Sequence, residues 1–265
     1  MTMNNVICGG MCLNFITGRV GTGKSTVANE LRKLGYPVIS LDSIFSDLLH
    51  HDPVTRATLY AKYGDEFSVK AGEVRVSFVM KFINDATVHD WVWNHLAGRV
   101  IEVIERTRGC IIGEQASFVE TPVIYPWIKR WLYNCGIALQ PPPMMTGERP
   151  VIQSVVREFR IETSDDTVGI ERKVTEFIKM HDLYLGTGTC TERLLFHSLE
   201  EIRKNEELVD NYRSTMKALA ERHISCENTE DKDGCLVVYN TLTYKNDAPD
   251  SPAEIAKQIA EEVRK

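Results

Sequence analysis

Short apolar runs and helically spaced apolar residues alternate along the first part of the chain. Residues 11–16 form an apolar run that predicts a buried strand. Residues 27–34 place valine and leucine at i, i+4 and i+7, which predicts a helix, and Gly35 is a suitable residue to end it. Residues 36–41 predict a second strand with Asp42 at its carboxyl end. A strand, a loop, a helix and a second strand in this order are the building block of a parallel sheet.

The same alternation continues toward the middle of the chain. Apolar residues at helical spacing predict a helix over residues 85–108, and residues 110–112 predict a third strand that ends near Glu114. Residues 137–139 predict a fourth strand. The prolines at 141–143 end regular structure, because consecutive prolines continue neither a helix nor an inner strand.

Helical spacing dominates from residue 151 to residue 226. Strand character returns at 235–239 and ends at Asn240. Residues 251–254 predict the start of a last helix, with serine as N-cap, proline at the first helical position and glutamate two residues further on.

These elements predict a three-layer α/β fold with a five-stranded parallel sheet. We expect residues 1–140 and 235–265 to form the core, and residues 141–234 to form a helical lid or insert. The charges agree with this division, because residues 141–234 hold 13 basic and 19 acidic residues and so carry the whole net charge of −6.

Composition excludes several classes of protein. The chain has 265 residues, of which 43% are hydrophobic and 26% charged, as in ordinary globular domains. It has no apolar run long enough to span a membrane, and its negative charge gives no general attraction for nucleic acid. Seven scattered cysteines without a CxxC pair are typical of reduced thiols, so we expect a cytoplasmic protein. The sequence leaves the oligomeric state open.

The chemistry is concentrated in residues 18–25, which read Gly-Arg-Val-Gly-Thr-Gly-Lys-Ser and match the phosphate-binding P-loop at every fixed position. Glycines let backbone N–H groups approach phosphate oxygens, and the following helix directs its positive end to the same place. Lys24 is expected to reach the β- and γ-phosphates of ATP, and the Ser25 hydroxyl to hold Mg²⁺. The predicted ATP contacts are Gly18, Gly21, Thr22, Gly23, Lys24, Ser25 and Thr26.

Four further residues are candidates for the reaction. Asp42 is expected to orient the acceptor, and it could also cap the next helix, since the two roles can coexist. Glu114 is either a site carboxylate or a solvated loop acid. Arg157 and Arg160 would share one face of a lid helix and stabilise the transferred charge, unless they are ordinary surface arginines.

The motif and its surroundings resemble the dephospho-coenzyme A kinase family of P-loop kinases. The resemblance rests on residues 17–28 and 35–42, with weaker similarity around Arg75, residues 82–85 and 95–96, residues 118–121, residues 153–160 and residues 237–240. It implies acceptor contacts from Asp42, Arg75, His95, Glu114 and Glu120, and an adenine-side contact from Asn240.

The chain also departs from the family pattern. Residues 40–42 read Ser-Leu-Asp where the family has Asp-x-Asp, and residues 95–96 read His-Leu where it has His-Pro. The usual Asp-x-Pro-Leu-Leu stretch is replaced by residues 114–117. ATP use should survive these changes, whereas the identity of the acceptor does not follow from the family.

We therefore expect an ATP- and Mg²⁺-dependent kinase acting on a small, nucleotide-like acceptor of the dephospho-coenzyme A or nucleoside monophosphate type. One alternative is a phage-type kinase that modifies hydroxymethylated bases or ends of DNA, which the charge disfavours. The other is a nucleotide-sensing regulatory P-loop protein.

Overall fold

The computed structural model describes residues 13–68, 74–109, 116–134, 156–165, 167–175, 206–228, 239–248 and 251–264. The strands are β1 (Leu13–Thr17), β2 (Val38–Ser40), β3 (Ser117–Glu120), β4 (Val156–Glu162) and β5 (Tyr239–Lys245). The named helices are α1 (Lys24–Lys33), α2 (Leu41–His51), α3 (Pro53–Tyr63), α4 (Val76–Asn84), α5 (Ala86–Gly109), α6 (Pro126–Asn134), α10 (Glu206–Asn228) and α11 (Ser251–Arg264), with a 3₁₀ turn at Gly64–Glu66. Residues 167–175 are also helical.

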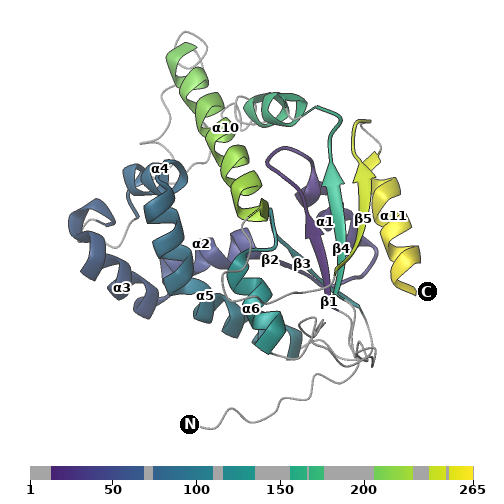
Figure 1. The fold of residues 1–265 in the computed structure, drawn as a ribbon, viewed down its shortest axis with the longest axis horizontal. Coiled ribbons are helices and arrows are strands. Elements are labelled where there is room, and N and C mark those ends of the chain that lie inside the picture. Colours follow the sequence, from purple (N-terminus) through teal and green to yellow (C-terminus); the bar gives the residue numbers. More distant parts are fainter. Residues whose placement is uncertain are drawn as a thin grey trace, which may run out of the picture.

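The strands form one parallel sheet in the order β2-β3-β1-β4-β5 (Figure 1). Glu120 lies opposite both Ile16 and Ser40, and Thr17 lies opposite Arg160. The carboxyl ends of β1 to β4 therefore meet at one edge, where ligands bind in sheets of this kind. The predicted α/β fold with a five-stranded parallel sheet is confirmed.

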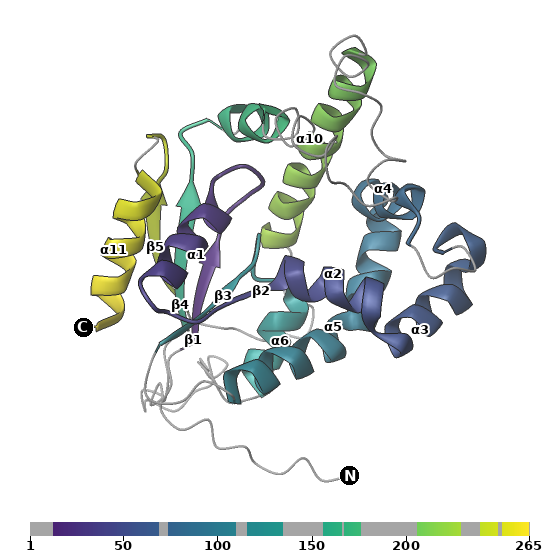
Figure 2. The same ribbon diagram turned by 180° about the vertical axis from the view of Figure 1, so that it is seen from behind.

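Two apolar layers hold the helices against the sheet. Successive residues of β1 point to opposite faces, so Phe15 joins one core cluster and Ile16 the other. The Ile16 cluster packs α1 and α11 on one face, and the Phe15 cluster packs α2 to α6 on the other (Figures 1 and 2). Each inner strand is covered on both sides, which explains the continuous apolar runs in the sequence.

Two strand predictions are displaced. The strand beside β1 on the β2 side is Ser117–Glu120, several residues after the predicted 110–112. Residues 110–112, Glu114 and the predicted strand at 137–139 lie outside the described residues. The last strand occupies Tyr239–Lys245 rather than ending at Asn240.

The continuous helical reading of residues 151–226 is wrong at β4. Val156–Glu162 forms a central strand between β1 and β5, and its buried residues include Val156, Phe159 and Ile161. The segment expected to be a separate helical insert therefore supplies part of the sheet. Alternating arginines and a glutamate concealed this strand, because such charges are unusual in a strand that is covered on both faces.

Other elements follow the predicted pattern. Helix α5 covers the region expected to be helical, and α11 starts at Ser251 and buries Ile255 and Ile259. Leu34 is 45% exposed because it caps α1 and does not lie on the buried face. Among the described residues no helix is both long and apolar enough to span a membrane.

Candidate functional site

The P-loop lies between the end of β1 and the first residue of α1. Gly18 donates its N–H to the carbonyl of Pro122 at 3.1 Å, and Gly23 caps α1 with φ of 84°, in the left-handed region that glycine adopts readily. Lys24 is the first residue of the helix and only 9% exposed. The positive end of the α1 dipole and the buried Lys24 side chain therefore lie together, and this combination favours binding of a polyphosphate.

Segments from the far half of the chain hold the P-loop in shape. Asn246, which follows β5 and is 1% exposed, donates Nδ2–H to the carbonyl of Thr22 at 2.7 Å. Arg172, on the helical segment 167–175, reaches the carbonyl of Gly21 at 3.4 Å. A Cβ on Gly21 would lie 2.0 Å from the carbonyl oxygen of Gly169, so only glycine fits here.

Ser25 and Glu120 join the P-loop to the end of β3. The Ser25 hydroxyl donates to Oε1 of Glu120 at 2.5 Å, and Glu120 is only 4% exposed. A hydroxyl and a carboxylate beside a phosphate-binding loop are the oxygen donors that Mg²⁺ uses together with substrate phosphates. The residues present therefore fit a Mg²⁺ ion. This contact places Glu120 beside the P-loop hydroxyl, whereas the resemblance implied an acceptor contact.

A cavity of about 440 Å³ lies beside the P-loop at the end of β4. Its lining includes Arg19, Thr22 and Arg160. The Arg160 guanidinium also bonds the Glu158 carboxylate at 3.1 Å, and that buried carboxylate accepts hydrogen bonds from Thr17 of β1 and Thr241 of β5 at 2.7 Å each. Arg160 is thus fixed next to the P-loop from a strand rather than from a lid helix.

A second cavity, of about 530 Å³, is formed by α5, α6 and α10 with the end of α4. The lining combines an aromatic wall with polar and charged side chains at its rim, among them His89, Trp93, Tyr125, Trp127, Glu221 and Arg222. The Trp93 ring stacks on Trp127 with centroids 5.6 Å apart. A cavity of this size with an apolar wall and a few polar groups is typical of a small-molecule site.

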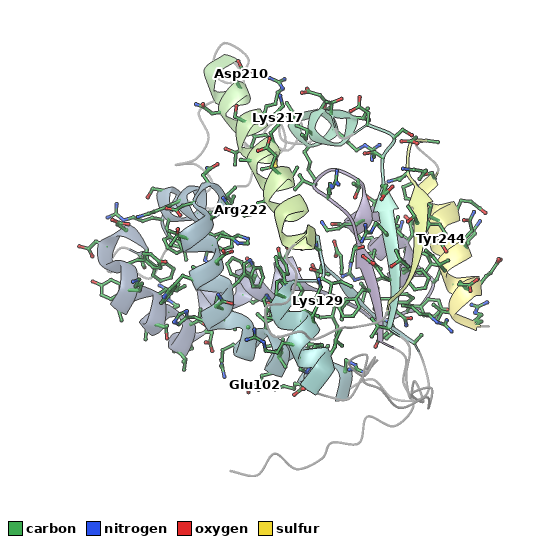
Figure 3. The ribbon with its side chains drawn as sticks, in the orientation of Figure 1. Glu102, Lys129, Asp210, Lys217, Arg222 and Tyr244 are labelled. Carbon is green, nitrogen blue, oxygen red and sulfur yellow. The ribbon has the colours of Figure 1, made fainter. Side chains whose placement is uncertain are left out.

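The carboxyl-terminal half of α10 runs toward the centre of the molecule, as the labels Asp210, Lys217 and Arg222 show (Figure 3). Arg222 donates Nη1–H to the carbonyl of Phe82 at 3.1 Å and lines the larger cavity. The next residue, His223, is 3% exposed and its Nδ1 has no hydrogen-bond partner among the described residues. Burial lowers the pKa of His223 to about 3, and the charges of Lys24, His89, Arg222 and Arg19 add to the effect.

The predicted acceptor residues are brought together only in part. Asp42 lies exposed in the first turn of α2, two residues after β2, and the N-cap of α2 is Ser40. It is therefore neither the strand end nor the helix cap that the sequence indicated. Arg75 and His95 are both exposed, and neither is among the described residues that line the larger cavity. The His95 ring stacks instead on Trp91 at 3.8 Å.

Two further predictions are corrected by the strands. Arg157 lies near the start of β4 and donates Nη1–H to the carbonyl of Glu262 in α11, at 3.0 Å. Asn240 pairs with Arg157 near the start of β5. In a parallel sheet both residues lie toward the edge opposite the P-loop, so neither the lid role of Arg157 nor the adenine contact of Asn240 is retained. Asn246, at the correct end of β5, was missed because the strand was placed too early.

Sequence reasoning also missed Arg172, His223 and the cavity wall. Arg172 and His223 lie on helices whose only sequence signal is apolar spacing. Trp93 and Trp127 are 6% and 9% exposed, as core residues are, and they also line the cavity. Periodicity does not distinguish a buried aromatic from one that faces a cavity.

Comparison with known proteins agrees with this geometry. The family model for dephospho-CoA kinase matches residues 12–125. A dephospho-CoA kinase from Xanthomonas oryzae pv. oryzae is 25% identical over 181 residues, covering 61% of this chain and 89% of that protein. One from Yersinia pestis is 28% identical over 78 residues, covering 29% of this chain and 38% of that protein.

A solved structure, TT1252 from Thermus thermophilus, superposes with a TM-score of 0.50 at 15% identity, covering 95% of this chain and 97% of that one. At this identity the likeness concerns the fold. The sequence similarity to the dephospho-CoA kinase family model is confined to residues 12–125, which is less than half of the chain. These matches, together with the P-loop, indicate an ATP-dependent phosphotransferase that is similar to the dephospho-CoA kinases.

Proposed function

We propose that this kinase transfers the γ-phosphoryl group of ATP to a small, nucleotide-like acceptor bound in the cavity between α5, α6 and α10. The observation that carries the proposal is the position of this cavity. Arg222 lines it, and the adjacent buried His223 lies close enough to Lys24 to be affected by its charge. The P-loop, where the donor phosphates would bind, and the cavity therefore lie close together near Arg222 and His223 of α10.

We assign a residue to each part of the reaction. Lys24 and the N-terminus of α1 hold the β- and γ-phosphates, and Arg160 is a candidate for stabilising charge on the transferred group. Ser25 and Glu120 would hold Mg²⁺, which would supply neutralisation of the phosphate charge. Asp42 is proposed to orient the acceptor. As the acceptor oxygen bonds to the γ-phosphorus, the bond to the β–γ bridging oxygen breaks and ADP leaves.

The test is transfer from labelled ATP in the presence of Mg²⁺ to a panel of dephospho-coenzyme A, nucleoside monophosphates and hydroxymethylated DNA, followed by thin-layer separation. Lys24→Ala should lower turnover by roughly a hundredfold or more, because a preorganised cation on the transferred phosphates is lost. Lys33→Ala is a matched control, since Lys33 lies on the same helix but is 70% exposed and pairs only with Glu30.

The outcomes separate the alternatives. Label on DNA would favour the DNA-modifying kinase over the small-molecule kinase. ATP binding without transfer to any acceptor would favour a regulatory P-loop protein. Turnover by Lys24→Ala equal to that of wild type would contradict the proposed donor site, provided Lys33→Ala behaves in the same way.

A further inference from the structure

Positively charged side chains from three elements act on His223, between the P-loop and the larger cavity. They are Lys24 of α1, Arg19 of the P-loop and Arg222 of α10. His89 of α5 is also near, but burial lowers its pKa and so disfavours its charged form. The three cations all oppose protonation of His223, and none of the charges found is negative. Cations that converge from several elements repel one another unless an anion lies among them.

His223 supplies an independent sign of a missing ligand. Its Nδ1 is buried without a hydrogen-bond partner among the described residues. Buried polar atoms are almost always hydrogen-bonded, so an unpaired one beside a cavity requires an explanation. An anionic oxygen would satisfy the imidazole and offset the surrounding cations at the same time.

An anion on each side of His223 would offset the cations there. The γ-phosphate of ATP lies on the P-loop side, where Lys24 and Arg19 are. Arg222 and His89 instead line the acceptor cavity. Within the described part of the chain, Arg222 donates one hydrogen bond, from Nη1 to the Phe82 carbonyl at 3.1 Å, and its guanidinium carries further N–H donors. These donors suit a phosphate oxygen of the acceptor.

The two carboxylates that line the cavity in the described structure, Asp90 and Glu221, are exposed, so neither is a shielded base for a hydroxyl acceptor. Asp90 is within 3.2 Å of the His89 ring nitrogen and its side chain is 67% exposed, and Glu221 lies at the exposed rim. A hydroxyl acceptor must lose its proton to a base near the transfer point. A phosphate monoester is largely deprotonated at neutral pH, because its second pKa is about 6, and it requires cations instead.

We infer that the acceptor is a nucleoside monophosphate, whose phosphate group is bound between Arg222 and His223 and receives the γ-phosphoryl group. This inference rests on the proposed function and narrows its acceptor to one class. An oxygen of the acceptor phosphate bonds to the γ-phosphorus while the bond to the β–γ bridging oxygen breaks. ADP leaves with that electron pair, and the product is a nucleoside diphosphate containing a new P–O–P linkage.

The experiment uses the full-length wild-type protein with ATP, Mg²⁺ and three sets of probes: the common ribo- and deoxyribonucleoside 5′-monophosphates, the matching nucleosides, and dephospho-coenzyme A. The products are examined by ³¹P NMR. The inference predicts product only from the monophosphates, with two coupled phosphorus signals in addition to the pair from ADP, which every transfer forms. A single uncoupled phosphomonoester signal, from a nucleoside or from dephospho-coenzyme A, would overturn it. Absence of transfer to any probe would instead count against the proposed function itself.

A matched pair of variants locates the phosphate. Arg222→Gln should raise the KM for the monophosphate by roughly tenfold or more, because a charge-assisted hydrogen bond is lost, while the KM for ATP changes little. Lys217→Gln, an exposed cation on the same helix, should leave both constants unchanged. Equal rises in both KM values for Arg222→Gln would contradict the assignment. His223→Gln keeps a neutral donor and is the second variant if Arg222→Gln folds poorly; it should lower kcat more than it raises the KM for ATP.

Discussion

The buried imidazole of His223 makes the stability of this protein depend on pH in a predictable direction. In the folded protein its pKa is lowered to about 3, chiefly by burial, from an ordinary value of 6.5. Between these two values the unfolded chain binds a proton that the folded chain does not. The contribution of neutral His223 to the free energy of unfolding should therefore be complete above about pH 6.5 and should decrease as the pH is lowered.

The size of the effect follows from the linkage relation. One pKa unit corresponds to about 1.36 kcal/mol, so lowering the pH from 7 to 5 should cost about 2 kcal/mol through His223 alone. His89 acts in the same direction, because burial also lowers its pKa. Carboxylates such as Asp52 and Glu171, whose pKa values are lowered in the folded protein, lose their contribution only below their ordinary values near 4.

The measurement is urea unfolding of wild type and His223→Gln at pH 7, 6 and 5, followed by tryptophan fluorescence and circular dichroism. The informative quantity is the slope of the unfolding free energy against pH, because glutamine at a buried site changes the absolute value as well. The variant should lose about 2 kcal/mol less than wild type across this range. Identical slopes for the two proteins would refute the neutral, buried state assigned to His223.

Two further stability predictions concern packing. Gly21→Ala should lower the unfolding free energy by roughly 2–5 kcal/mol and weaken ATP binding, because its φ is 81° and its Cβ would lie 2.0 Å from the Gly169 carbonyl oxygen. Gly98→Ala is the control, because Gly98 lies in the middle of α5 with open space around the new Cβ, and it should raise the unfolding free energy by about 0.5–1 kcal/mol. Equal losses of unfolding free energy from both changes would contradict the close contact at Gly21. Leu31→Ala, fully buried between α1 and the sheet, should cost about 2–5 kcal/mol in urea unfolding while leaving the KM for ATP nearly unchanged.

The sequence alone determined the features that depend on residues close together in the chain. The P-loop was identifiable because its glycines, lysine and serine must stand at fixed spacing for a loop to surround phosphate. Helices α5 and α11 were identifiable because one face of each is buried along its length, which imposes a 3.6-residue period. The parallel sheet followed from alternating strand and helix signals.

Only the tertiary structure decided which distant residues meet. The strand β4 carries Arg157, Glu158 and Arg160, and its charges are acceptable because α11 and neighbouring strands supply their hydrogen-bond partners. The contact between Ser25 and Glu120 joins residues 95 positions apart and depends on the order of strands in the sheet. His223 lies near Lys24 and Arg19 only because α10 packs toward the P-loop. Local propensity does not encode such encounters, because they arise from packing of the whole sheet with its helices.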